Sequence, residues 1–346
     1  MSTTTDKPRV VVADDSALMR RIVSNLLARG GMAVVGTARD GDEALAMCET
    51  EQPDAMTLDL AMPGLGGIDV LRELRRRGGP HIPVVVVSAF SPAHGAHAVD
   101  ALAEGAFELV PKPNSTTEVE AFEQNLLGKI TLATRTRRLP APWRRRPADH
   151  GHERRRPRDG VARALLIATS TGGPRALATL IPGLPAPLGL GTMIVQHMPA
   201  GFTSSLAARL DRSSRLTVRE AQGGETMQPG VALVAPGGRH LRLAADGQTA
   251  VSDEAPLGGL RPRADLLIED AAGRWGDRLT LVVLTGMGND GLRGAQAVRR
   301  HGGRILVEAE STCTVYGMPR VVAEAGLADD VLSLDQMGAA IAAEVN

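Results

Sequence analysis

The sequence is poor in aromatic residues and in cysteine, and each shortage excludes a class of function. Tryptophan, tyrosine and phenylalanine make up 2% of the 346 residues, so the hydrophobic cores must consist mainly of aliphatic side chains. Few rings are available to stack on bases, which argues against a protein that binds single-stranded nucleic acid. The two cysteines, Cys48 and Cys313, cannot form a disulfide framework and have no zinc-binding spacing.

Long hydrophobic runs and a net charge are also absent. The first residues, MSTTTDKPRV, contain no apolar leader, and no apolar run approaches the roughly 18 residues of a membrane span. We therefore expect a cytoplasmic protein that does not insert into a membrane. The 39 basic and 39 acidic residues balance, so net charge identifies no partner. At about 150 residues per domain, the length predicts two domains.

Basic residues are concentrated in one segment. Residues 135–163 carry eleven arginines against three acidic residues, together with four prolines. This composition is typical of an extended, self-repelling linker, although a basic run could also bind nucleic acid or an acidic partner. We favour the solvated linker and expect no nucleic-acid binding. The predicted boundaries are a first domain at 1–127, a linker at 128–160 and a second domain at 161–346.

Short apolar runs alternate with helical patterns on both sides of this segment. RVVVA (9–13) is typical of a buried strand, and the helical pattern at 16–31 has Ser16 as its N-cap. In the second half, 240–252 is typical of a hairpin that turns at Asp246–Gly247. Strands that alternate with helices imply parallel sheets with right-handed crossovers. The predicted fold class is therefore α/β, with two doubly wound parallel-sheet domains.

Polar residues end several predicted strands of the first domain, where an open parallel sheet binds its ligands. They are Asp14 and Asp15 after the first strand, Asp59 after the third, Ser88 after the fourth and Lys112 after the fifth. Three neighbouring carboxylates repel one another unless a cation lies among them, and an oxygen-rich site suits Mg²⁺. The lysine and serine would offer a charge and a hydroxyl to a phosphoryl group. Taken singly, each residue could equally be a helix cap, a loop residue or a surface residue.

As a set, these residues resemble the receiver domain of response regulators, a flavodoxin-like fold, over about residues 7–127. The resemblance implies that Asp59 accepts a phosphoryl group from a histidine kinase. It further implies that Asp14, Asp15 and Asp59 bind Mg²⁺, that Ser88 and Lys112 complete the site, and that Lys112–Pro113 is a cis peptide. The sequence departs from the family at Gly66, where an aspartate is usual, and at Leu109, where a switch aromatic is usual. We expect both to alter the conformational read-out.

The second domain contains a strand, a turn of small residues and a helix start in LLIATSTGGP (165–174). The pattern approximates the G-x-S-x-G elbow, with Ala168 in place of the first glycine. Ser170 could be a nucleophile, part of a phosphate-binding loop, or a helix cap. No Walker lysine or G-x-G-x-x-G accompanies it, which argues against phosphate binding. His197 and Asp290 each follow a later strand and could serve as base and orienting acid. Because the order Ser–His–Asp matches no familiar triad, a core histidine and a loop aspartate stay open as alternatives.

Five sequence motifs occur in the second domain in this order: ATSTGGP, VQHMPAGFTSSLAARLD, VALVAPGGRHL, LTGMGNDG and VYGMPR. Together they resemble the catalytic domain of the chemotaxis protein-glutamate methylesterases, the CheB family, which has a Rossmann-like fold and carries a receiver domain in front. The resemblance implies that Ser170 is the nucleophile, His197 the general base and Asp290 the residue that orients the imidazole. It also assigns Thr171 and the oxyanion-binding amide of Met287 to the site. Thr169 stands where alanine is usual.

The resemblance further implies a reaction and its partners. The enzyme would hydrolyse glutamate 5-methyl esters of methyl-accepting chemoreceptors, releasing methanol, and would deamidate receptor glutamines, with no cofactor in the catalytic domain. We expect a monomer whose receiver domain covers the catalytic site until Asp59 is phosphorylated. Two rival classes are a regulator whose second domain only binds a protein or nucleotide, and a DNA-binding regulator that uses the arginine-rich linker. The lack of a helix-turn-helix pattern argues against the second.

Overall fold

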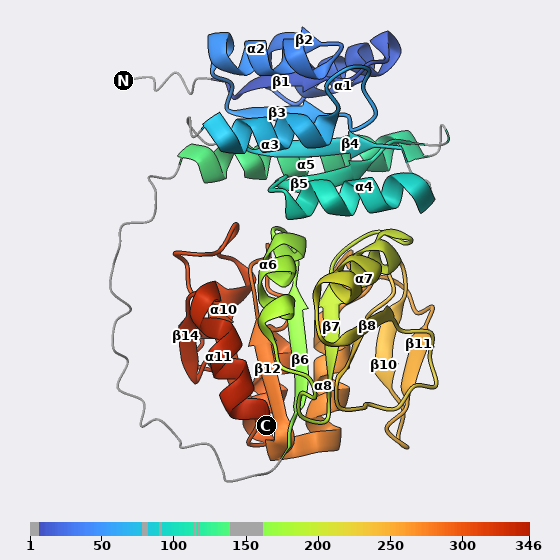
Figure 1. Cartoon of the computed structure of the whole chain (residues 1–346), viewed down its shortest axis with the longest axis vertical. Helices are drawn as coiled ribbons and strands as arrows, with labels where there is room; N and C mark the ends of the chain where they lie inside the picture. The colour runs from blue at the N-terminus through green and yellow to red at the C-terminus, as the bar shows by residue number, and fades with distance from the viewer. Residues whose placement is uncertain (1–6, 78–81, 90–91, 114, 116–117, 139–161) are drawn as a thin grey trace. The chain divides into compact units, whose positions relative to one another are not determined.

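The computed structural model describes residues 7–77, 82–89, 92–113, 115, 118–138 and 162–346 (Figure 1). The chain divides into two compact units, Met1–Ala141 and Pro142–Asn346, and each contains its own parallel sheet. The predicted fold class is therefore confirmed. No helix in these ranges is both long enough and apolar enough to cross a membrane.

The first unit is built on a five-stranded parallel sheet in the order β2-β1-β3-β4-β5. Its strands are β1 (Arg9–Ala13), β2 (Ala33–Ala38), β3 (Ala55–Leu58), β4 (Val84–Ser88) and β5 (Glu108–Pro111). Its helices are α1 (Ala17–Arg29), α2 (Gly41–Glu51), α3 (Gly67–Arg77), α4 (Pro92–Ala103) and α5 (Val119–Arg138).

Helix α1 begins and ends where the sequence predicts. The Ser16 hydroxyl accepts a hydrogen bond from the amide of Met19, which satisfies a free donor of the first turn. Val23, Leu26 and Leu27, spaced three and four residues apart, form its buried face. The helix therefore packs one apolar stripe against the sheet and ends next to Gly30.

Helix α5 extends past residue 127, where we placed the end of the first domain. Leu126, Ile130 and Ala133 are fully buried and follow one another at helical spacing, so the same apolar face continues to the last turns. The first unit therefore includes the beginning of the predicted linker. Residues 139–161 lie outside the described residues, and the rest of the linker stays a prediction.

The second unit is built on a seven-stranded parallel sheet in the order β14-β13-β12-β6-β7-β9-β8. Its strands are β6 (Ala164–Thr169), β7 (Gly191–Gln196), β8 (Thr217–Glu220), β9 (Val231–Val234), β12 (Leu279–Val283), β13 (Arg304–Glu308) and β14 (Asp330–Leu332). The predicted hairpin is present as β10 (His240–Leu243) and β11 (Thr249–Ser252). The helices are α6 (Gly173–Leu180), α7 (Phe202–Ser213), α8 (Ala264–Trp275), α9 (Leu292–Arg300), α10 (Met318–Glu324) and α11 (Leu334–Val345), with 3₁₀ turns η2 (Ile181–Gly183) and η3 (Gly276–Arg278).

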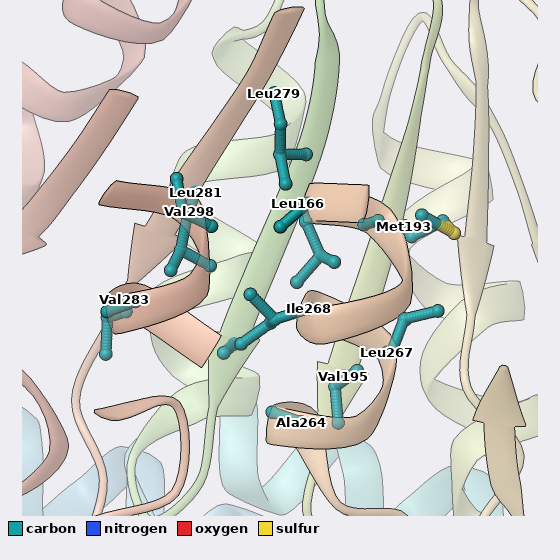
Figure 2. Packing of buried hydrophobic residues seen from close by; sticks show 14 of the residues in the cluster. Leu166, Met193, Val195, Ala264, Leu267, Ile268, Leu279, Leu281, Val283 and Val298 are labelled. Carbon is teal, nitrogen blue, oxygen red and sulfur yellow. The ribbon is translucent and has the colours of Figure 1, made fainter. Parts of the chain in front are cut away.

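The core of the second unit is aliphatic, as the shortage of aromatic residues requires. Helix α8 packs its Leu267 and Ile268 side chains against the sheet, close to Leu166 of β6 and Val195 of β7 (Figure 2). These side chains are fully buried. Because β6 and β7 lie at the centre of the sheet, this core supports the strand ends that carry the polar residues described next.

Candidate active site

The carboxylates of the first unit gather at one edge of its sheet. Asp14 and Asp15 follow β1 and Asp59 follows the neighbouring β3, and one carboxylate oxygen from each lies within 4.8 Å of the others. Asp14 and Asp59 are buried, whereas Asp15 is exposed. The predicted cluster is therefore present, with one side open to solvent.

Lys112 is the cation among these acids. Its Nζ lies 2.8 Å from an oxygen of Asp14 and 2.7 Å from an oxygen of Asp59. Burial raises the pKa of Asp14, although its contacts with Lys112 act in the opposite direction. Burial would lower the pKa of Lys112, but its hydrogen bonds to the two carboxylates outweigh that effect and raise it. One ammonium does not balance three carboxylates, so this oxygen-rich cluster fits a hard divalent cation such as Mg²⁺.

The remaining receiver residues lie on neighbouring strands. Ser88 ends β4 with a buried side chain, and the Lys112 amide donates to the Ser88 carbonyl over 2.8 Å. Leu109, in place of the usual aromatic, is 2% exposed. The expected cis peptide is wrong: within the described residues the cis bonds are Ala186–Pro187 and Arg261–Pro262. Lys112 reaches both carboxylates with its bond to Pro113 in the ordinary trans form.

The second unit places Ser170 in a sharp turn between β6 and α6. The Ser170 amide donates to the Thr285 carbonyl over 3.0 Å, and the Gly173 amide donates to the Ser170 carbonyl over 2.8 Å. The cap of α6 is Gly172, whose φ of 80° is a left-handed conformation that favours glycine. The Ser170 side chain is therefore not the helix cap, and Pro174 is the second residue of the helix.

The segment after β12 packs directly on this turn. A Cβ added to Gly286 would lie 2.8 Å from the Ser170 Cβ and 3.1 Å from the Ser170 amide nitrogen. A Cβ added to Gly172 would collide with Thr314. The buried hydroxyl of Thr169, at the family's alanine position, donates to the Thr285 carbonyl over 3.0 Å. Gly286 thus allows its backbone to approach the serine closely, and Gly172 leaves room for the Thr314 side chain beside the turn.

His197 directly follows β7, beside the serine turn. Its amide donates to the Thr169 carbonyl over 3.2 Å, which joins the ends of β6 and β7. Its ring Nε2 lies 2.7 Å from Oδ2 of Asp290, and its side chain is 9% exposed. Nε2–H therefore points to the carboxylate, and the ring's Nδ1 is the nitrogen left to accept a proton.

Asp290 is held as a buried anion at the start of α8. Its carboxylate accepts the amides of Ala264 at 2.7 Å, Asp265 at 2.9 Å and Gly291 at 2.9 Å. Burial alone would raise the pKa of Asp290. The hydrogen bond and charge of His197, with the helix amides, outweigh that effect and lower the pKa to about 2. The carboxylate is therefore ionised near neutral pH and holds one imidazole tautomer.

A second charged pair lies behind Asp290, and sequence reasoning missed it. The Arg263 guanidinium contacts Asp265 over 2.8 Å, and its Nε lies 3.4 Å from Oδ1 of Asp290. Asp265 also accepts the Gly291 amide, and burial followed by the charge of Asp290 raises the pKa of Asp265. A signal for this pair is present in the sequence, because RPRAD (261–265) places three charged residues at the start of a helix.

The sheet order brings these residues to one edge of the sheet. Strands β12, β6 and β7 are neighbours, and the segments that follow them carry Asp290, Ser170 and His197, respectively. Thr171 is 5% exposed, and its carbonyl accepts the Thr285 hydroxyl over 2.9 Å. Met287 has a 59% exposed side chain, and its amide donates to no acceptor among the described residues. The catalytic roles of these five residues remain predictions.

Comparison with known families matches both units. Residues 165–341 match the CheB methylesterase family, and residues 10–122 match the response regulator receiver domain. The second match agrees with the position of the Asp14, Asp15 and Asp59 cluster.

Relatives match over nearly the whole chain. A protein-glutamate methylesterase/protein-glutamine glutaminase of Symbiobacterium thermophilum is 42% identical over 361 residues, covering 99% of this chain and 98% of the relative. A Myxococcus xanthus protein of the same name, numbered 5, is 40% identical over 336 residues, with 95% of each chain covered. The crystal structure of the Thermotoga maritima CheB methylesterase catalytic domain is 41% identical and covers 53% of this chain and 98% of that domain, with a TM-score of 0.51. The chain therefore belongs to the CheB methylesterase family, with a receiver domain ahead of its catalytic domain.

Proposed function

We propose that this chain is a phosphorylation-activated hydrolase that removes methyl groups from glutamate 5-methyl esters of chemoreceptors and deamidates their glutamines. The observation that carries the proposal is the 2.7 Å contact between His197 and the buried carboxylate of Asp290, beside the turn that holds Ser170. This arrangement supplies the nucleophile, base and orienting acid of acyl transfer. The names of the relatives support the substrate class.

The first half of the reaction forms an acyl-enzyme. The Ser170 Oγ attacks the ester carbonyl carbon while Nδ1 of His197 takes the hydroxyl proton. Asp290 stabilises the imidazolium that forms, because its ionised oxygen receives Nε2–H. We assign the negative oxygen of the tetrahedral intermediate to the Met287 amide, which has no acceptor among the described residues. Such a donor typically lowers the activation barrier by about 3–4 kcal/mol.

The remaining steps complete the acyl-enzyme and then return the enzyme to its starting state. The tetrahedral intermediate collapses, the C–O bond to methoxide breaks, and His197 protonates the methoxide to give methanol. A water molecule then gives a proton to His197 and attacks the glutamyl ester of Ser170. When this second tetrahedral intermediate collapses, the bond to Ser170 Oγ breaks, His197 returns the proton to Oγ, and the glutamate carboxylate is released. With a glutamine substrate, the same sequence releases ammonia in place of methanol. The half-buried position of Ser170 keeps the hydroxyl accessible to a side chain presented from a receptor surface.

We propose that a histidine kinase phosphorylates Asp59 and that this modification raises methylesterase activity. Asp14, Asp15 and Asp59 are the residues that would hold Mg²⁺. The ion would neutralise charge on the incoming phosphoryl oxygens. Lys112 contacts Asp59 directly and would stabilise the phosphoryl group from the other side, with Ser88 nearby on β4. We propose that the reaction takes place in the cytoplasm, where the proposed kinase would reach Asp59.

Methanol release from membranes that carry methyl-labelled chemoreceptors tests the proposal. The full-length protein should release methanol, faster with a phosphodonor. Ser170→Ala should release none, and Asp59→Asn should keep the basal rate but gain nothing from the phosphodonor. If Ser170→Ala released methanol at the wild-type rate, the catalytic assignment would be wrong. If Asp59→Asn were stimulated like the wild type, the assignment of the phosphoacceptor would be wrong.

A further inference from the structure

Gln196 is a buried polar residue that the mechanism above does not use. It is the last residue of β7 and is 2% exposed. Its partner in the parallel ladder is Thr169, the last residue of β6. Gln196 therefore directly precedes His197 in the chain and lies beside Thr169, the residue that directly precedes Ser170.

The side-chain amide of Gln196 donates to two main-chain carbonyls. Its Nε2 lies 3.0 Å from the Ser170 carbonyl oxygen and 3.0 Å from the His197 carbonyl oxygen. An amide nitrogen carries two protons, so each carbonyl receives one. The two acceptors belong to the proposed nucleophile and the proposed base.

The amide oxygen of Gln196 shows that the two carbonyls determine which way the amide faces. Within the described residues, Oε1 of Gln196 is buried and has no hydrogen-bond partner. Turning the amide over would place this oxygen against two carbonyl oxygens, which repel it, and would leave both carbonyls without the amide protons. A buried acceptor without a partner costs stability. An apolar side chain of similar size would avoid that cost.

The neighbouring glycine completes the arrangement. A Cβ added to Gly173 would collide with Oε1 of Gln196 and with the Thr169 hydroxyl. The turn after Ser170 thus has no side chain where the Gln196 amide needs room. A requirement for the two donated hydrogen bonds explains both Gly173 and the unpartnered Oε1 of Gln196, even though the unpartnered oxygen lowers local stability.

We infer that Gln196 is a positioning residue that holds the main chains of Ser170 and His197 at a fixed separation. The inference rests on the proposed Ser170–His197–Asp290 triad. Proton transfer from Oγ to Nδ1 requires these atoms within hydrogen-bond reach, and a displacement of about 1 Å can cost 100-fold in rate. Gln196 acts through the backbone of both residues and does not contact substrate.

Gln196→Met tests the inference in the full-length protein, because methionine keeps the length and removes both donors. We expect kcat for methanol release to fall about 10- to 100-fold with KM unchanged. The unfolding midpoint should stay near the wild-type value, because the unpartnered oxygen is removed together with the two hydrogen bonds. The rate constant for labelling by a fluorophosphonate serine reagent should fall in parallel with kcat.

Thr192→Val is the matched control. Thr192 is on the same strand, fully buried, and its Oγ1 has no partner among the described residues. This variant removes a buried polar atom from β7 away from the turn, so kcat and the labelling rate should equal those of the wild type. Gln196→Glu is the second test variant in case Gln196→Met does not fold, since it keeps the shape and can supply at most one proton. Its kcat should also fall with KM unchanged.

Other results would overturn the inference. Folded Gln196→Met and Gln196→Glu with wild-type kcat and labelling rates would show that the two hydrogen bonds position nothing. A rise in KM at constant kcat would mean that Gln196 contacts substrate instead. Ser170→Ala distinguishes failure of the proposed triad from failure of the role of Gln196. Wild-type activity in Ser170→Ala would refute the triad itself. An inactive Ser170→Ala together with a fully active Gln196→Met would refute only the role of Gln196.

Discussion

Gly286 lies so close to Ser170 that a single added methyl group should misplace the nucleophile. In Gly286→Ala the new Cβ would lie 2.8 Å from the Ser170 Cβ and 2.5 Å from Sδ of Met318. Carbon atoms in contact are normally about 3.5–4.0 Å apart. The end of the methionine side chain can rotate away, but the Ser170 Cβ is fixed to its main chain. The serine turn must therefore move by roughly 1 Å.

The size of the effect follows from that displacement. A shift of about 1 Å in a reacting group can cost around 100-fold in rate, so we expect kcat of Gly286→Ala to fall by about that factor. Overpacking a tight site also costs about 1–3 kcal/mol of stability, so the variant should still fold. Activity should thus fall much more than the folded fraction.

The assay compares methanol release with unfolding in the same full-length protein. Trp275 in α8 gives a fluorescence signal for unfolding of the second unit. Gly273→Ala is the control, because a Cβ there has no atom within 4 Å and the residue lies in the last turn of α8, the helix that contains Trp275. It should raise stability by up to about 1 kcal/mol and leave kcat unchanged. A folded Gly286→Ala protein with wild-type kcat would refute the reasoning, because the close approach would then not determine where Ser170 lies.

Four further outcomes are expected. Asp290→Asn should lower kcat by about 10⁴-fold in the methanol assay, because asparagine does not stabilise the imidazolium or select its tautomer. The pKa of Asp290 is lowered from 3.8 to about 2, so its ionised form stabilises the fold above about pH 4, and this contribution of about 2 kcal/mol is lost as the pH falls toward 2. Urea unfolding should show that Asp290→Asn lacks this pH dependence. Chelation of divalent cations should abolish stimulation by a phosphodonor and spare basal methanol release, and equal stimulation with and without the chelator would contradict the Mg²⁺ assignment. Thr169→Ala should lower the free energy of unfolding by about 1 kcal/mol, because the hydrogen bond of the Thr169 hydroxyl is lost. Its kcat should stay near the wild-type value, because the Ser170 amide still donates to the Thr285 carbonyl.

Local patterns in the sequence predicted the strand ends and the polar residues after them. Asp14, Asp59 and Lys112 each follow an apolar run, and parallel strands end at one edge of a sheet. Their convergence could therefore be predicted from the order of residue types alone. The same reasoning brought Ser170 and His197 together, and both follow central strands.

Features that depend on tertiary contacts could not be predicted in this way. The length of α5 follows from the burial of Ile130 and Ala133 against the rest of the unit, which the arginine-rich composition of its end conceals. The short edge strand β14 pairs three half-buried residues with β13, too few for an alternating pattern. Arg263 looks like a surface residue in the sequence, yet its guanidinium lies between two buried carboxylates. In each case a contact with a distant segment of the chain determines the local structure or the burial of the residue.

The unfamiliar chain order Ser–His–Asp follows from the position of β6 in the sheet. This strand comes first in the second unit, yet β7 lies on one side of it and β12 on the other. Loops that leave two adjacent strands in opposite directions open a crevice at their carboxyl ends, and ligand sites form there. The nucleophile turn after β6 can therefore meet a base after β7 and an acid after β12, although about ninety residues separate the last two in the chain. The sheet neighbours of the nucleophile strand, rather than the order of residues along the chain, determine which side chains can form the triad. The same adjacency places Gln196 beside Thr169 and brings its amide within reach of both catalytic main chains.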